Sequence, residues 1–256
     1  MRLNFNKQLS TKYKNLSQKV RVLTEQWLSD WIFCPSCGQQ KIYKYPNNKP
    51  VADFFCPSCR EEYELKSKQG SIGTKLLDGE YQTKIKRLRS TTNPNLFVLN
   101  YNLKSLSVVN LFVIPKYFFI PEVIEKRKPL SSTARRSGWI GSNILLQKVP
   151  QAGKIFLIRQ GKFEQKEKVL AGWRKTLFLL EEKEISQRGW LLDVMRCVEK
   201  IGKCKFSLQD IYRFEDELSI IHPNNKHIKD KIRQQLQVLR DKNYLDFVSR
   251  GYYRMT

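Results

Sequence analysis

The sequence of 256 residues predicts two domains, an α/β or α+β domain over residues 1–182 and a smaller helical domain over residues 183–256. In the first domain, short apolar runs of strand type stand between amphipathic helical segments, whereas helical periodicity dominates the second. The charge is also uneven. Residues 1–180 hold 32 Lys and Arg against 12 Asp and Glu, and residues 181–256 hold 15 against 12. This asymmetry indicates two domains with different surfaces.

In the first domain, Ser17 is expected to cap a helix over residues 18–31, where apolar residues recur at helical spacing. A second helix, with a basic face, is expected over residues 78–90. Apolar runs bounded by turn residues predict strands at 51–55, 63–68, 95–101, 107–115 and 154–160. Helices on a mixed sheet follow from this order of elements.

The second domain begins with a helix that ends at Gly202, followed by a helix over residues 207–219 that Ser207 caps. A third helix covers residues 227–243, and YLDFVSRGYYRM alternates around Arg250-Gly251 as a β-hairpin does. Three helices and a terminal hairpin resemble the winged helix-turn-helix family. A generic three-helix bundle is the alternative.

The charge of the third helix favours DNA binding over a merely solvated surface. Residues 225–242 carry six Lys and Arg against two Asp, whereas the preceding helix is acidic. Arginine and glutamine make bidentate contacts to guanine and adenine edges in the major groove. The side chains expected to reach duplex DNA from this helix are Lys226, Arg233, Gln234 and Gln237.

The net charge of +23 favours a polyanionic partner, most often nucleic acid. The N-terminus MRLNFNKQLS lacks the apolar core of a signal peptide, so a soluble, intracellular protein is expected. The most apolar stretch, SVVNLFVIPKYFFIPEVI, contains Pro115, Lys116 and Pro121 and is too short to span a bilayer. We therefore expect no membrane partner, and in a reducing cytosol the six cysteines should bind metal or pack.

Two C-P-S-C motifs predict a zinc site. Cys34 and Cys37 form the first pair, Cys56 and Cys59 form the second, and eighteen residues separate the pairs. This spacing is within the range for a Cys₄ zinc site, in which each pair offers two thiolates to one tetrahedral ion. Four cysteines leave no open position on the metal, so the predicted Zn²⁺ is structural. A redox-active dithiol is the weaker alternative.

Asp53 precedes Glu64-Leu65-Lys66 by ten residues, as in the D-x(n)-E-x-K pattern of the PD-(D/E)xK nucleases. These enzymes use two carboxylates to hold Mg²⁺ and a lysine to stabilise negative charge near the attacking water. In a strand, Glu64 and Lys66 would share one face. A salt-bridged surface hairpin is the alternative for an isolated match, but the basic chain and the winged helix favour a nuclease. Glu25 is a possible third carboxylate.

The zinc knuckle between these residues then has a mechanical role. If Cys56 and Cys59 form the turn between two adjacent strands, the zinc ion fixes the register of those strands. It would hold Asp53 and Glu64 at one Mg²⁺ site without taking part in the chemistry.

Several stretches make the chain resemble the DpnI-like family of methyl-directed restriction endonucleases over essentially its whole length. They are SQKVRVLTEQW, the two CPSC motifs, NKPVADF, EEYELKSK, KPLSSTARRSGWIG, IYRFE, NKHIKDKIRQQLQVLRDK and RGYYR. The resemblance implies a PD-(D/E)xK core of mixed sheet and helices with a zinc-knuckle insertion, followed by a winged helix. It also implies Mg²⁺-dependent cleavage of double-stranded DNA at GATC carrying N6-methyladenine, read by both domains.

By the same resemblance, Asp53, Glu64 and Lys66 match the catalytic positions, and Trp139 matches a loop tryptophan that senses the methyl groups. Arg135 and Arg136 beside it suit phosphate or guanine contacts. The other interpretation of Trp139, a core residue, stays open on sequence alone. A monomer in the cytoplasm of a prokaryotic cell is expected.

The sequence is also compatible with two function classes other than a nuclease. The first is a non-catalytic, zinc-containing winged-helix regulator that binds DNA, which would have no need of the Asp53, Glu64 and Lys66 triplet. The second is an RNA-binding protein, which the absence of a recognisable RNA-binding motif disfavours.

Overall fold

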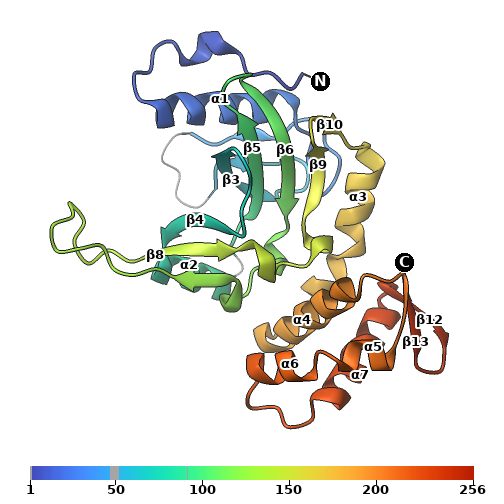
Figure 1. Ribbon diagram of the computed structural model, residues 1–256. Coiled ribbons are helices and arrows are strands. Elements are labelled where there is room, and N and C mark those ends of the chain that lie inside the picture. Colours follow the sequence, from blue (N-terminus) through green and yellow to red (C-terminus); the bar gives the residue numbers. More distant parts are fainter. Residues whose placement is uncertain (1, 47–51, 91) are drawn as a thin grey trace. The chain divides into compact units, whose positions relative to one another are not determined.

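The computed structural model describes residues 2–46, 52–90 and 92–256 (Figure 1). The chain divides into two compact units, one of residues 1–146 and 153–174 and the other of residues 147–152 and 175–256. The α+β fold class predicted for the chain is confirmed, with a mixed sheet in the first unit and a winged helix-turn-helix in the second. The predicted domain boundary between residues 182 and 183 stays a prediction.

A seven-stranded mixed sheet forms the centre of the first unit, in the order β1-β2-β3-β5-β6-β9-β10. Only β3 and β5 are parallel, and the other neighbours are antiparallel. The strands are β1 (Tyr43–Lys44), β2 (Phe54–Phe55), β3 (Glu62–Gln69), β5 (Asn95–Asn102), β6 (Ser107–Ile114), β9 (Ile155–Arg159) and β10 (Lys162–Phe163). The central strands coincide with the apolar runs of the sequence because each is buried on both faces.

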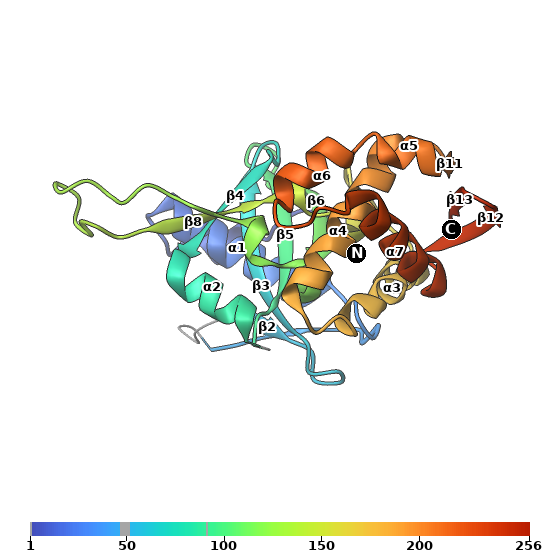
Figure 2. The ribbon, with the colours of Figure 1, turned by 90° about the horizontal axis from the view of Figure 1, so that it is seen from below.

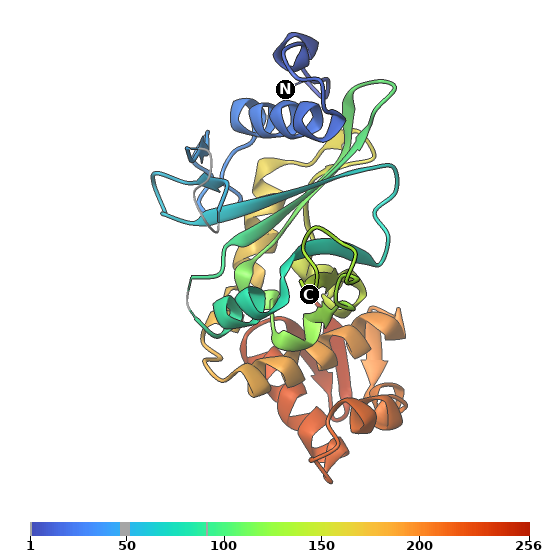
Figure 3. The same cartoon turned by 90° about the vertical axis from the view of Figure 1, so that its left-hand side faces the viewer.

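Helix α1 (Leu16–Trp31) and helix α3 (Lys166–Lys175) share one hydrophobic core with this sheet. Leu28 of α1 and Trp173 of α3 both lie in that core, together with Phe97 of β5. Seen in Figures 1 and 3, α1 and α2 (Tyr81–Arg89) lie on either side of β3. Helix α1 therefore supplies apolar residues to the core of the sheet, whereas α2 is a basic helix beside the strands of a second, smaller sheet.

A second, three-stranded sheet that the sequence did not predict stands beside α2. It has the order β4-β8-β7, with β4 (Lys75–Glu80), β7 (Ile124–Lys126) and β8 (Gly141–Leu145). The loop of residues 127–140 connects β7 to β8 and projects outward from this sheet (Figure 2). The antiparallel strands β7 and β8 support this loop, which carries Arg135, Arg136 and Trp139.

The second unit is the predicted winged helix. Its helices are α4 (Ile185–Ile201), α5 (Leu208–Tyr212), α6 (Glu215–Ile221) and α7 (Ile228–Asp241), and its sheet has the order β11-β13-β12. The strands are β11 (Lys205–Ser207), β12 (Leu245–Ser249) and β13 (Tyr252–Met255). As predicted, Gly202 ends α4 in the left-handed conformation and Ser207 caps α5 through a capping box.

Short 3₁₀ segments complete the secondary structure. They are Lys7–Ser10, Lys116–Phe118, Pro121–Val123, Leu146–Lys148, Gln151–Gly153 and Leu177–Leu180.

Three local expectations need correction. The cap of α1 is Asn15, whose side chain accepts from the backbone N–H of Ser17 at 2.8 Å, so Ser17 already lies in the helix. The helix predicted over residues 207–219 breaks at Phe214, because the acidic residues that follow are stabilised at a new helix N-terminus. Residues 78–80 belong to β4 rather than to the helix that follows.

The strand predicted over 51–55 is regular only at Phe54–Phe55. Val51 and the rest of the motif segment 48–51 lie outside the described residues. Pairing nevertheless continues through Asp53, whose N–H donates to the carbonyl of Tyr63 and whose carbonyl accepts from Tyr45. Asp53 is therefore held beside β3 although it lies immediately before the first residue of β2.

Candidate functional site

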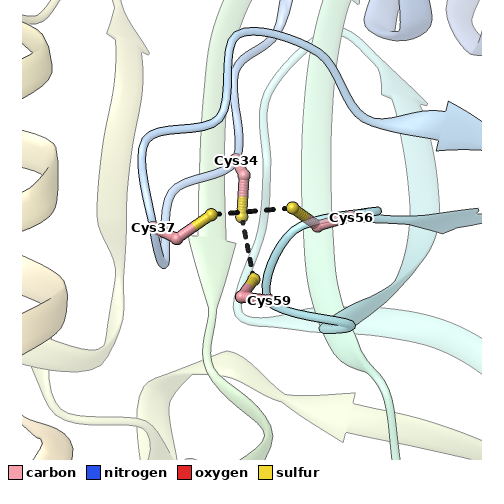
Figure 4. Close-up of side chains that lie close together, drawn as sticks. All are labelled: Cys34, Cys37, Cys56 and Cys59. Atoms are coloured by element: carbon pink, nitrogen blue, oxygen red, sulfur yellow. Dashed lines mark hydrogen bonds between the residues drawn. The ribbon is translucent and has the colours of Figure 1, made fainter.

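The sulfurs of Cys34, Cys37, Cys56 and Cys59 point toward one another in Figure 4. All four lie within 4.8 Å of one another, and two of the sulfur pairs are separated by 3.6 Å. Zinc–sulfur bonds of about 2.3 Å in tetrahedral geometry place sulfurs about 3.8 Å apart. The cluster therefore has the size of a tetrahedral zinc site and could hold a zinc ion.

Both knuckles have the same backbone turn. The N–H of Gly38 donates to the carbonyl of Cys34 at 2.8 Å, and the N–H of Arg60 donates to that of Cys56 at 3.0 Å. The donor residue is left-handed in each case, with φ of 81° at Gly38 and 60° at Arg60. Glycine adopts this conformation freely, whereas Arg60 must be held in it by its surroundings.

The second knuckle forms the turn between β2 and β3, as the sequence predicts. Phe54 pairs with Tyr63, and the N–H of Cys56 donates to the carbonyl of Glu61. Tyr63 is fully buried, and its hydroxyl lies 3.0 Å from the sulfur of Cys34. The first knuckle and strand β3 are thus joined by a direct side-chain contact at the residue that precedes Glu64.

Two of the four thiols, those of Cys34 and Cys59, are held in the protonated form in the absence of a metal ion. Burial raises the pKa of the Cys59 thiol to about 11 and raises the pKa of the Cys34 thiol further. A zinc ion binds thiolates, so it must displace these protons. The affinity of the cluster for zinc therefore depends on pH.

The predicted catalytic residues line one cavity of about 300 Å³ in the first unit. Asp53 lies immediately before β2, and Glu64 and Lys66 belong to β3. Leu65, between them, packs against the hydrophobic core, as the alternation of a strand requires. The carboxylate of Asp53 accepts a hydrogen bond from the N–H of Leu65 at 2.7 Å. The fold thus brings together the three residues that the motif singled out.

Glu25 of α1 lines the same cavity, but its carboxylate already has two cationic partners. Arg21 approaches it at 2.7 Å and Lys44 at 2.6 Å. Arg87 of α2 is a further cavity residue, which the sequence analysis did not identify. The cavity therefore combines carboxylates with guanidinium groups suited to phosphate.

Two more residues that the sequence analysis missed contact the catalytic triplet. Asp78 of β4 accepts from Lys66 at 2.9 Å, and Lys84 of α2 lies 3.4 Å from Glu64. Lys84 and Asp78 are themselves 3.0 Å apart. Neither residue belongs to the linear motif, so only the pairing of β4 and the position of α2 could reveal them.

The surroundings set the protonation of the cavity. Burial raises the pKa of Asp53, and the carboxylates of Glu64 and Glu25 raise it further against the hydrogen bond from Leu65. Burial alone would lower the pKa of Lys66, but Glu64 and Asp78 raise it above its ordinary value. Lys66 is therefore a stable cation, suited to stabilising negative charge rather than to accepting a proton.

The donor set fits a hard divalent cation. Asp53 and Glu64 offer carboxylate oxygens, the ligand type that Mg²⁺ prefers, and among the described residues that line the cavity none offers sulfur or imidazole. The mutual repulsion that raises the pKa of Asp53 would be relieved by such an ion.

The residues expected to contact DNA are distributed over both units. Arg135 and Arg136 are exposed at the tip of the loop of residues 127–140, and Trp139 is half-buried. The indole ring covers Gly141 so closely that an added Cβ would lie 2.7 Å from it. Trp139 is thus absent from the hydrophobic core, against the core interpretation.

In the second unit, the expected DNA-contacting side chains are exposed: Lys226, Arg233, Gln234 and Gln237. Ile232 and Leu236 are buried on the opposite face of α7. Arg233 is held in place by the hydroxyl of Tyr212 and by the ring below its guanidinium. Lys226 precedes the helix rather than lying on it, which corrects its expected position.

Among the helices of residues 2–46, 52–90 and 92–256, none has the length and apolar character needed to cross a bilayer.

Comparison with known families covers both parts of the chain. A model of the Dam-replacing family, DpnI, matches residues 1–182, and a model of the Dam-replacing HTH domain matches residues 186–255. The matches indicate a methyl-directed restriction enzyme that acts on DNA and carries a DNA-binding helix-turn-helix domain.

Proposed function

The chain belongs to the Dam-replacing, or DpnI, family, and from this we propose that it is a type II, methyl-directed restriction endonuclease. It hydrolyses phosphodiester bonds of double-stranded DNA at GATC sites that carry N6-methyladenine, and it requires Mg²⁺. The observation that carries the proposal is that Asp53, Glu64 and Lys66 line a single cavity within the part of the chain that the family model matches. The enzyme acts as a monomer in the cytoplasm of a prokaryotic cell.

Asp53 and Glu64 would hold Mg²⁺, which supplies a Lewis acid for the scissile phosphate and lowers the pKa of water. Lys66 stays charged beside Glu64 and stabilises the negative charge that develops on the phosphate. The hydrogen bond from the N–H of Leu65 fixes the orientation of the Asp53 carboxylate, which would hold Mg²⁺. The Cys₄ cluster holds structural Zn²⁺ and keeps the β2–β3 turn in register, since it adjoins both strands.

Both units contact the methylated duplex in this proposal. The loop that carries Arg135, Arg136 and Trp139 contacts phosphates and places an indole edge where a methyl group can pack. In the winged helix, Arg233, Gln234 and Gln237 of α7 read the major groove, and Lys226, which precedes α7, contacts the duplex beside them. With so many lysines neutralising phosphates, affinity should fall steeply with salt.

A plasmid digest tests the proposal. The purified protein is incubated with Mg²⁺ and one plasmid, prepared with and without adenine methylation at GATC. Discrete fragments from the methylated preparation alone are expected, and the Asp53→Ala variant should produce none. Cleavage of both preparations would discard the methyl dependence. Tight binding of methylated DNA without cleavage of either preparation would favour a non-catalytic regulator.

A further inference from the structure

Four charged side chains form a closed ring beside the candidate catalytic cavity. Lys66 lies 2.7 Å from one carboxylate oxygen of Glu64 and 2.9 Å from one of Asp78. Lys84 lies 3.0 Å from the other oxygen of Asp78 and 3.4 Å from the other oxygen of Glu64. Each ammonium therefore has two carboxylate partners, and each carboxylate has two ammonium partners.

The ring is buried most deeply at Asp78 and Lys84. The side chain of Asp78 is 3% exposed and that of Lys84 is 8% exposed, against 19% for Glu64 and 26% for Lys66. A charge this deep is costly unless it is paired. Lys84 therefore needs a carboxylate partner in every state of the site.

Glu64 cannot serve both ammonium groups and a metal ion equally well. Lys66 and Lys84 occupy one oxygen of Glu64 each, so a divalent cation must compete with them for that carboxylate. Asp78 uses a different oxygen for each lysine and does not line the cavity. It is thus the partner that both lysines can keep when Glu64 binds a cation.

We propose that Asp78 is a positioning residue for the metal site: it retains Lys66 and Lys84 when Glu64 turns to the divalent cation. The proposal rests on the proposed function, since it presupposes a cation bound by Asp53 and Glu64. Asp78 touches neither substrate nor metal in this scheme. Without it, both ammonium groups would depend on Glu64 alone, and the cation would be repelled.

A double-mutant cycle on Asp78 and Lys84 tests this role by metal binding rather than by cleavage. Mn²⁺ is titrated into the zinc-loaded, full-length protein without nucleic acid, and free Mn²⁺ is followed by its paramagnetic resonance signal. Asp78→Asn should weaken Mn²⁺ binding on the order of 10- to 100-fold, the usual effect of losing a group that orients a metal ligand. Lys84→Met should bind Mn²⁺ at least as tightly as the wild type, because it removes one competitor for Glu64.

The decisive variant is the double mutant, D78N with K84M. It removes a cation and an anion together, so Glu64 faces one lysine instead of the two that depend on it in D78N, and most of the lost Mn²⁺ affinity should return. A merely structural role for Asp78 predicts that the two substitutions add or worsen each other. A double mutant as weak as D78N, or a D78N protein with wild-type affinity, would overturn the proposal.

Two controls separate the possible failures. Glu80→Gln changes an acidic residue two positions along the same strand, where Glu80 caps α2 through the N–H groups of Gln82 and Thr83. The E80Q variant should have a lower thermal stability than the wild type and the same Mn²⁺ affinity. If E80Q lost as much Mn²⁺ affinity as D78N, the effect of D78N would be a structural one. Asp53→Ala should abolish Mn²⁺ binding at the site. Equal binding by D53A and wild type would overturn the metal site itself, and the proposed function with it.

If the D78N variant does not fold, the role of Asp78 is tested by comparing the Mn²⁺ affinity of the double mutant with that of the wild type. Its net charge equals that of the wild type, and neutral replacement of a buried ion pair is often tolerated. A double mutant that folds but binds Mn²⁺ much more weakly than the wild type would then contradict the proposed role.

Discussion

The contact between Tyr63 and the cysteine cluster gives a quantitative prediction. The Tyr63 hydroxyl lies 3.0 Å from the sulfur of Cys34, and both residues are completely buried. When zinc is bound, Cys34 is a thiolate and the hydroxyl donates to it. Tyr63→Phe removes this donor but keeps the ring, which stacks on Phe97 with a centroid separation of 4.8 Å. The substitution therefore isolates one hydrogen bond.

The size of the effect follows from the charge of the acceptor. Hydrogen bonds to charged groups contribute about 1.5–3 kcal/mol. At about 1.4 kcal/mol for each tenfold change, Y63F should weaken zinc binding by about 10- to 100-fold. The same range is typical when a group that supports a metal ligand is removed.

The assay is competition for zinc between the protein and a chromophoric chelator, followed by absorbance. Tyr117→Phe is the matched control, because its hydroxyl is also buried but donates to the carbonyl of Trp173 at 3.4 Å. Y117F should keep wild-type zinc affinity. Wild-type affinity in Y63F, or an equal loss in Y117F, would refute the account of Tyr63 as a support for the cluster.

Four further outcomes are expected. Asp53→Ala should abolish cleavage yet keep duplex affinity within a few-fold, as a gel-shift titration with methylated DNA would measure; continued cutting would mean that the metal site is wrongly assigned. Trp139→Ala should reduce the preference for methylated over unmethylated duplex by about tenfold, the scale of a single base contact, and unchanged discrimination would remove the indole from methyl recognition. Zinc affinity should rise with pH, because Cys59 with a pKa of about 11 must lose its proton; chelator competition at several pH values would expose a flat response. Leu236→Ala, at a fully buried position of α7, should cost about 2–5 kcal/mol of unfolding free energy, and calorimetry showing an unshifted transition would contradict that.

The sequence by itself predicts the turns, strand faces and helix ends of this chain. The two CPSC motifs predict a four-sulfur cluster because each turn is closed within five residues. Alternation in β3 separates Glu64 and Lys66 from Leu65 without knowledge of any neighbouring strand. Gly202 and Ser207 mark helix ends through their own backbone and side-chain preferences.

Tertiary structure alone decided which distant groups join the candidate site. Asp78 reaches Lys66 because β4 pairs with β8, whose partner residues lie more than sixty positions away. Lys84 reaches Glu64 because α2 packs beside that sheet, and nothing in its local sequence distinguishes it from the other basic residues of the helix. The helix α3 likewise owes its place to burial of Val169 and Trp173 in a core built by remote strands. Short-range preference determines turns, caps and strand faces, whereas the closed ring of charges exists only because long-range pairing and burial bring opposite charges together.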